Sequence, residues 1–202
     1  MLEFIAKGGP IMYVIVALSP IAIAIIVERL VFFRKIRVDE EKIIARLKAT
    51  LEKGHHDEAL AICEANPSPI TNLMKVGIEN RHLPRHELKE IVLDAAGLEI
   101  PKLERFLSTL GTIVTVAPML GLLGTVTGNI KAFDVLGKFG SVGDPSLLAV
   151  GIAEALITTV GGLVVAIPAL IFYNYLVSKV NHIIIRLENR VNEMILYVGE
   201  KK

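Results

Sequence analysis

The residues with the clearest chemical capacity lie inside three long apolar stretches of this 202-residue chain. Glu154 is the one charged residue within these stretches. A carboxylate held in hydrocarbon costs about 2.5–3.5 kcal/mol on insertion scales, so Glu154 is a functional candidate. Thr125, Thr158 and Thr159 add hydroxyls that donate and accept hydrogen bonds but do not titrate near neutral pH. The threonines are residues that can line a water-filled path, and Glu154 is a titratable residue within the spans.

Structural roles remain open for the same residues. Glu154 could sit near the outer membrane interface or hold two helices together, and a threonine in a membrane helix often bonds its own backbone four residues back. On a helix, Glu154 and Thr159 are separated by about 140°, so both cannot point into one narrow lumen. One arrangement places Thr159 on a pore and Glu154 toward a neighbouring helix or the rim. Which of Thr158 and Thr159 faces the lumen stays undecided.

The apolar stretches that carry these residues predict the fold. Hydrophobic residues make up 52% of the chain and concentrate in residues 10–27, 106–130 and 147–177. Each stretch is long enough to cross about 30 Å of hydrocarbon at about 1.5 Å per residue. We therefore predict an all-α integral membrane protein with three transmembrane helices and a helical cytoplasmic domain. The net charge of +1 gives no indication of a nucleic-acid partner.

Lysine and arginine are crowded between the first and second spans and after the third, which predicts that these segments are cytoplasmic. The N-terminus is then outside the membrane and the C-terminus is in the cytoplasm. The predicted order is a periplasmic N-terminus (1–9), a first transmembrane helix (10–27), a cytoplasmic helical region (28–105), a second transmembrane helix (106–131), a periplasmic loop (132–146), a third transmembrane helix (147–177) and a cytoplasmic C-terminal helix (178–202).

Within the cytoplasmic region, local signals predict three helices. Asp39 can cap a helix that Gly54 ends, and a shorter helix precedes the helix-breaking NPSP at residues 66–69. Pro84 fits the first turn of a third helix, which either continues into the second span with a kink at Pro101 or breaks there. Before the third span, Asp144 is a candidate cap. The apolar spacing of residues 184, 187, 191 and 195 predicts that the third helix continues and packs against this region.

Small residues form stripes on the two later spans. On the second span one broad face carries Gly111, Thr115, Pro118, Gly121, Leu122, Thr125, Asn129 and Ala132, with Gly124 and Gly128 beside it. On the third span the stripe is Gly151, Ala155, Thr158, Gly162, Ala166 and Ala169. Small residues let helix backbones approach closely in lipid. The residues predicted to serve helix packing are Pro118, Gly121, Gly124, Gly128, Gly151 and Gly162.

Patterns for catalysis or cofactor binding are weak. Residues 121–128, GLLGTVTG, lack the spacing of a dinucleotide fingerprint, and His82 and His86 have metal spacing but are interrupted by Pro84 and lack a third ligand. No histidine or cysteine lies within a span. Cys63, the single cysteine, is predicted to be a small apolar residue of the core. We therefore expect no enzyme, no metal and no cofactor.

Three motifs together resemble one family. They are AIIVERLVFFRK at 24–35, APMLGLLGTVTG at 117–128 and GIAEALITTVGGLVVAIPALIFYN at 151–174. In order and spacing they are similar to the MotA/TolQ/ExbB proton-channel family. The three spans and the long first cytoplasmic segment resemble the ExbB and TolQ branch rather than the four-span flagellar stator.

This resemblance implies a function that the residues alone do not give. It implies a multi-pass subunit of the bacterial inner membrane, forming a homo-oligomer (a pentamer) around the single spans of an ExbD- or TolR-like partner, with a TonB- or TolA-like energy transducer beyond. By resemblance Thr125 and Thr159 are pore threonines and Glu154 is the membrane glutamate, while the main proton carrier is an aspartate of the partner. Such a protein couples the proton motive force to transport or work at the outer membrane.

Two other functions remain open. A passive helical scaffold would use the small-residue stripes only to assemble a ring, and would tolerate changes at Glu154 and Thr159. A stand-alone ion channel is disfavoured because the spans lack a second carboxylate. The sequence does not separate an ExbB from a TolQ role, a proton from a sodium current, or one transported client from another.

Overall fold

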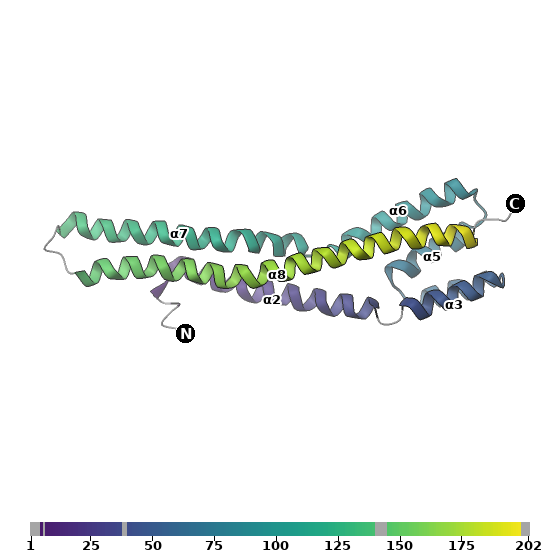
Figure 1. Ribbon diagram of the computed structural model, residues 1–202, viewed down its shortest axis with the longest axis horizontal. Helices are drawn as coiled ribbons and strands as arrows, with labels where there is room; N and C mark the ends of the chain where they lie inside the picture. The colour runs from purple at the N-terminus through teal and green to yellow at the C-terminus, as the bar shows by residue number, and fades with distance from the viewer. Residues whose placement is uncertain (1–4, 6, 38–39, 140–144, 199–202) are drawn as a thin grey trace. The chain divides into compact units, whose positions relative to one another are not determined.

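The computed structural model describes residues 5, 7–37, 40–139 and 145–198, and the regular elements within these residues are α-helices (Figure 1). Three of the helices, α2, α7 and α8, each contain a stretch long and apolar enough to cross a membrane. The prediction of an all-helical chain with three candidate spans is therefore confirmed. The helices are α2 (Gly9–Arg37), α3 (Glu40–Glu52), α4 (His56–Ala65), α5 (Pro69–Glu79), α6 (Arg85–Leu103), α7 (Leu107–Phe139) and α8 (Pro145–Val198).

The chain divides into two compact units. The first unit combines Met1–Arg29 with Phe106–Leu176, and the second combines Leu30–Arg105 with Val177–Lys202. Helices α2 and α8 contribute residues to both units. The candidate spans and the functional candidates within them belong to the first unit.

In the first unit, α7 and the first half of α8 run side by side (Figure 1). The side chains between helices are mostly small, as at Ala117, Ala155 and Ala169, which are at most 2% exposed. The large apolar side chains face outward: Leu122 is 64% exposed and Leu156 is 62% exposed. An apolar exterior over a core of small residues is typical of helices that pack in lipid.

The second unit has an ordinary hydrophobic core. Helices α3 to α6 and the later part of α8 contribute fully covered aliphatic side chains, including Leu47, Ile78, Leu88 and Leu187. Burying such a side chain stabilises the folded state by about 1.5–3 kcal/mol. The apolar spacing at the end of α8 thus corresponds to a packed face, as the sequence predicted.

Helix α5 is missing from the sequence prediction, which treated NPSP only as a break. Ser68 caps this helix: its Oγ accepts a hydrogen bond from the Thr71 amide at 3.2 Å, and its own amide donates to Thr71 Oγ1 at 2.8 Å. Pro69 occupies the first turn, where its missing amide hydrogen costs nothing. The same four residues therefore end α4 and begin α5.

Several predicted boundaries differ from the structure. Pro84 is the N-cap residue of α6 and lies just before its first turn, while Pro101 lies inside α6, which ends at Leu103. The break before α7 includes Phe106, whose φ of 63° is rare for a residue with a side chain. Helix α7 continues to Phe139, so residues 132–139 are helical where a loop was predicted. Asp39 and Asp144, the predicted caps, lie outside the described residues.

Candidate functional site

The contact between α7 and α8 is close enough that side chains would not fit at several glycines. A Cβ atom on Gly121 would lie 3.0 Å from Thr159 Cα, and one on Gly128 would lie 2.7 Å from the Gly151 carbonyl oxygen. A Cβ on Gly124 would overlap the side chain of Thr158. The backbones of the two helices therefore approach each other along the glycines of α7.

The same closeness is found from the α8 side. A Cβ on Gly162 would lie 2.5 Å from the Ala117 carbonyl oxygen, and one on Gly151 would lie 3.0 Å from the Ala132 amide nitrogen. Every residue of the predicted α8 stripe is buried, and Gly151, Thr158 and Gly162 lie against α7.

The predicted face of α7 is only partly correct. Thr115, Leu122 and Asn129 were placed on the packing face, but all three are exposed. The buried line of α7 instead runs through Leu110, Ala117, Gly121, Gly124, Gly128 and Ala132. Close approach occurs where side chains are smallest, so α7 turns its glycines toward α8 and leaves Thr115, Leu122 and Asn129 outside the contact. Pro118 is half-buried near this line.

Thr125 and Thr159 meet across the α7–α8 contact. Their hydroxyl oxygens are 2.5 Å apart, and Thr159 also reaches the Gly121 carbonyl oxygen at 3.1 Å. Both side chains are half-buried. Residues one turn away on either helix, Leu122 and Leu156, are exposed. The two hydroxyls therefore form a polar pair next to an outward apolar surface.

This threonine pair lies on the side of α8 away from α2. Helix α2 contacts α8 at Gly161, where a Cβ would be 2.7 Å from Met12 Sδ, and Gly8, directly before α2, lies near Ile157. Thr159 is two residues from each of these positions, which is a rotation of about 200° on a helix. The pair is therefore not covered by α2.

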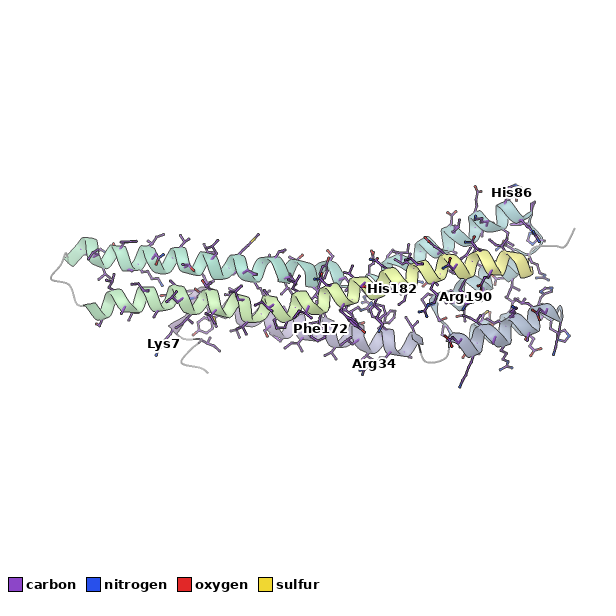
Figure 2. The ribbon with its side chains drawn as sticks, viewed as in Figure 1. Lys7, Arg34, His86, Phe172, His182 and Arg190 are labelled. Atoms are coloured by element: carbon purple, nitrogen blue, oxygen red, sulfur yellow. The ribbon has the colours of Figure 1, made fainter. Side chains whose placement is uncertain are left out.

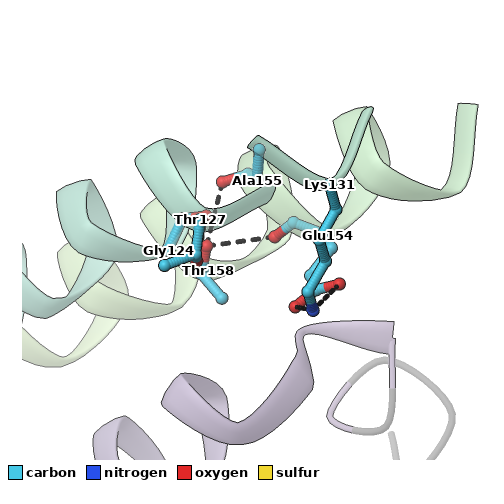
Figure 3. Close-up of polar contacts among 6 residues, drawn as sticks. All are labelled: Gly124, Thr127, Lys131, Glu154, Ala155 and Thr158. Carbon is cyan, nitrogen blue, oxygen red and sulfur yellow. Dashed lines mark hydrogen bonds and ion pairs between the residues drawn. The ribbon is translucent and has the colours of Figure 1, made fainter. Parts of the chain in front are cut away.

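Thr158 has a different environment from Thr159. Its side chain is 0% exposed and faces Gly124. Its hydroxyl donates to backbone carbonyls of its own helix, those of Glu154 at 3.0 Å and Ala155 at 2.9 Å (Figure 3). Thr158 thus fills space between the helices, and its hydrogen bond is satisfied locally.

Glu154 forms an ion pair with Lys131 of α7. The Lys131 ammonium lies 2.6 Å from Glu154 Oε1 and 2.8 Å from Oε2 (Figure 3). The Glu154 side chain is 12% exposed and the Lys131 side chain is 53% exposed. The sequence prediction missed this pair. The signal available was a lysine at the end of one span and a lone carboxylate near the start of the next.

The polar residues of the second unit make structural contacts. The buried carboxylate of Glu99 accepts hydrogen bonds from Asn72 at 3.0 Å and from Lys102 at 2.7 Å. His86 stands on the outside of α6 with its side chain 80% exposed (Figure 2). Among the described residues no group of three or more His, Cys, Asp or Glu side chains is placed to hold a metal ion.

Cys63 is buried in the second unit, as predicted. Burial raises the pKa of its thiol from the ordinary 9.0 to about 11, although the nearby Lys75 opposes this shift. On the surface, a hydrogen bond from Lys75 lowers the pKa of the Glu64 carboxyl, and the same contact raises the pKa of Lys75. A thiol with a raised pKa is a poor nucleophile at neutral pH.

Comparison with known proteins identifies the family. The model of the MotA/TolQ/ExbB proton channel family matches residues 65–189, which is more than half of the chain. A Methanothermobacter thermautotrophicus protein named as an ExbB homolog is 35% identical over 188 residues, covering 93% of this chain and 66% of its own length. The ExbB-like 1 protein of Synechocystis sp. is 35% identical over 184 residues, covering 88% of this chain and 71% of its own length.

A shorter match extends to the Tol-Pal system. TolQ of Haemophilus influenzae is 44% identical over 89 residues, which cover 44% of this chain and 39% of TolQ. The relatives thus carry both ExbB and TolQ names. The chain spans about two thirds of the length of the relative from Methanothermobacter thermautotrophicus.

Proposed function

The chain belongs to the MotA/TolQ/ExbB proton channel family, in its ExbB/TolQ branch, and we propose on that premise that it is the ring-forming subunit of a proton-driven membrane motor. Several copies, five by family resemblance, would enclose the single spans of an ExbD- or TolR-like partner. A TonB- or TolA-like protein would pass the work to the outer membrane. The chain would lie in the inner membrane with its N-terminus outside and its C-terminus in the cytoplasm.

The observation that carries this proposal is the threonine pair. Thr125 and Thr159 offer two hydroxyls 2.5 Å apart beside an outward-facing surface, on the side not covered by α2. A hydroxyl can donate and accept, so the pair could pass a hydrogen-bonded chain to a neighbouring helix. Thr159 is the better candidate for the lumen than Thr158, whose side chain is fully buried.

A threonine pair cannot store a proton, so a titratable group must be supplied. The apolar stretches 10–27, 106–130 and 147–177 hold Glu154 and no aspartate, which supports a carboxyl group from the partner helix as the proton carrier. Protonation would neutralise that carboxylate beside the threonine-lined wall and allow the partner to shift or rotate. The driving force is about 2.3 kcal/mol per charge for each 100 mV.

The scaffold alternative gains no support from the glycines. Gly121, Gly124 and Gly128 contact α8 of the same chain, so their small size is accounted for without a ring. An interface between copies would have to use the exposed large apolar side chains instead.

Assembly is the first test. Native mass spectrometry of the detergent-purified protein, alone and after co-expression with the ExbD- or TolR-like protein of its own genome, should detect a closed ring that takes up the partner. A monomer, or a ring that never binds such a partner, contradicts the proposal.

Proton flux is the second test, in vesicles that hold the assembled complex. Thr159→Val should leave the ring assembled and abolish flux. Thr127→Val is the matched control, because Thr127 Oγ1 bonds the Gly124 carbonyl of its own helix and does not contact Thr159. Wild-type flux in Thr159→Val would rule out a role for this hydroxyl in the path.

A further inference from the structure

The first unit contains a second polar group, distinct from the threonine pair. It consists of Lys131 on α7 and Glu154 on α8, whose charged atoms are 2.6 Å and 2.8 Å apart. Both carboxylate oxygens are engaged by one ammonium group. Figure 3 shows this pair beside α2, whereas Thr158 points into the α7–α8 contact.

Helix α2 closes over the carboxylate. Gly9 has a φ of +64°, and a Cβ at this position would overlap Glu154 Oε1. Glu154 is accordingly only 12% exposed, although its side chain is a carboxylate. Three helices therefore meet at this one side chain. Helix α8 carries Glu154, α7 supplies the Lys131 ammonium group, and α2 contacts Glu154 through the backbone of Gly9.

The position of Glu154 separates it from the threonines. The contact with Gly9 places Glu154 on the α2 side of α8, and the five-residue step to Thr159 is a rotation of about 140°. The two threonine hydroxyls bond each other and backbone carbonyls, whereas the Glu154 oxygens bond Lys131.

Electrostatics favours the paired state. A carboxylate that is withdrawn from water must be paired or must take up a proton, because its ionised form loses its hydration. Lys131 carries three donors and keeps half of its surface exposed, so it retains solvation while it neutralises Glu154. Removing Lys131 leaves the mostly covered Glu154 carboxylate uncompensated, which destabilises the folded state, whereas removing Glu154 leaves a lysine that water still solvates.

We propose that Lys131 is the counter-ion that keeps Glu154 ionised and ties α7 to α8 beneath Gly9 of α2. Lys131 is then a positioning residue, and Glu154 is a fixed charge that neither takes up nor releases a proton during the working cycle. The ion pair itself does not depend on the proposed function, whereas the statement about the working cycle rests on it.

Charge exchange tests the pair in the full-length, detergent-purified protein. Lys131→Glu and Glu154→Lys should each lower the thermal unfolding midpoint by several degrees, because each places like charges together. The double variant should recover most of the loss, and Lys131→Arg should remain close to the wild type. Losses that simply add in the double variant would overturn the pairing.

Lys138→Gln provides a matched control on the same helix. Lys138 also forms a 2.7 Å ion pair, with Asp134, but both side chains are more than half exposed. Its removal should leave the midpoint unchanged. A shift as large as that of Lys131→Gln would mean that the Glu154 pair is an ordinary surface contact and would overturn the proposal.

Infrared difference spectroscopy tests the charge state directly. The infrared spectrum of the wild type minus that of Glu154→Gln at neutral pH should contain positive carboxylate bands from Glu154. It should contain no positive band of a protonated carboxyl group. In a Lys131→Gln background, the same subtraction should show a protonated carboxyl band. A protonated Glu154 in the otherwise wild-type protein would overturn the counter-ion role.

Proton flux through the complex with its partner tests the fixed charge. The double exchange variant should restore flux together with the midpoint, since a fixed pair works in either orientation. Recovery of the midpoint without flux would overturn the statement that the pair acts only as a fixed charge. Absence of flux in the wild type would overturn the proposed function. The midpoint and infrared measurements would still show whether Lys131 is the counter-ion of Glu154.

Discussion

Thr125 and Thr159 lie on different helices, 34 residues apart in the sequence, and share a hydrogen bond between hydroxyl oxygens 2.5 Å apart. Each hydroxyl has one hydrogen to donate. One threonine therefore donates to the other, and the second donates to a backbone carbonyl such as that of Gly121, 3.1 Å from Thr159 and 3.2 Å from Thr125. The pair has two such arrangements, and it exchanges them by rotating both hydroxyls.

Thr125→Val should separate the role of this pair in stability from its role in flux. The variant removes one hydrogen bond, which costs about 0.5–1.5 kcal/mol, because Thr159 can still donate to Gly121. Thermal unfolding should change little, while proton flux in vesicles should be lost. Thr127→Val should change neither. If Thr125→Val instead unfolds at a much lower temperature while each folded ring carries as much proton flux as the wild type, the threonine pair serves helix packing alone.

Gly124→Ala should destabilise the α7–α8 contact. The added Cβ overlaps Thr158, and overpacking of this kind costs about 1–3 kcal/mol. The thermal unfolding midpoint in detergent is the measurement.

Gly137→Ala is the opposite case on the same helix. Nothing lies within 4 Å of a Cβ at Gly137, so alanine should be neutral or stabilising by up to about 1 kcal/mol. Equal effects of Gly124→Ala and Gly137→Ala would contradict the close approach at Gly124.

Cys63 should make the protein less stable at alkaline pH. Its folded pKa of about 11 exceeds the ordinary 9.0, so between these values the unfolded state binds fewer protons than the folded state. Stability contributed by the protonated thiol is therefore intact below pH 9 and falls above it, by up to about 1.4 kcal/mol per pH unit. The measurement is the unfolding midpoint from pH 8 to about pH 11.

The control for this pH dependence is Cys63→Ala, which should have a shallower alkaline decline than the wild type. Thiol alkylation gives an independent check. The folded protein should react slowly near pH 9 and the denatured protein quickly. Rapid alkylation of the folded protein at neutral pH would contradict a buried, protonated thiol.

Ser68→Ala should loosen the start of α5. It removes the acceptor for the Thr71 amide, and loss of such a cap costs about 1 kcal/mol. Hydrogen exchange at the first amides of α5 should accelerate by about fivefold, the factor that corresponds to this energy. Ser68→Asp keeps a hydrogen-bond acceptor at the cap and should retain slow exchange. Equal exchange rates in the wild type, Ser68→Ala and Ser68→Asp would show that the Ser68 cap does not stabilise the start of α5.

Most of the fold could be predicted from local pattern. The spans follow from length and composition, and the packed stripe of α8 follows from helical spacing, because each depends on one helix alone. Helix α5 was predictable but missed: Ser68, Pro69 and Thr71 form a start signal in residues that were read only as an end signal.

The site was less predictable because it depends on two helices at once. The meeting of Thr125 with Thr159 and of Lys131 with Glu154 requires the register of α7 against α8, and one sequence does not fix that register. The rotation of α7 shows the same limit. The predicted stripe was too broad to lie entirely against α8. Its glycines lie closest to α8 because they allow the closest backbone contact, while Thr115 and Asn129 are exposed.

The two units follow opposite rules for the placement of bulk. In the first unit small residues such as Ala155 are inside and large ones such as Leu156 are outside, whereas the second unit buries leucines such as Leu88 in the usual way. A charged residue at Leu156 would make the outer surface of the first unit less compatible with lipid but more soluble in water, whereas one at Leu88 would disrupt the interior of the second unit. Screens for soluble or detergent-tolerant variants should therefore treat the two units separately.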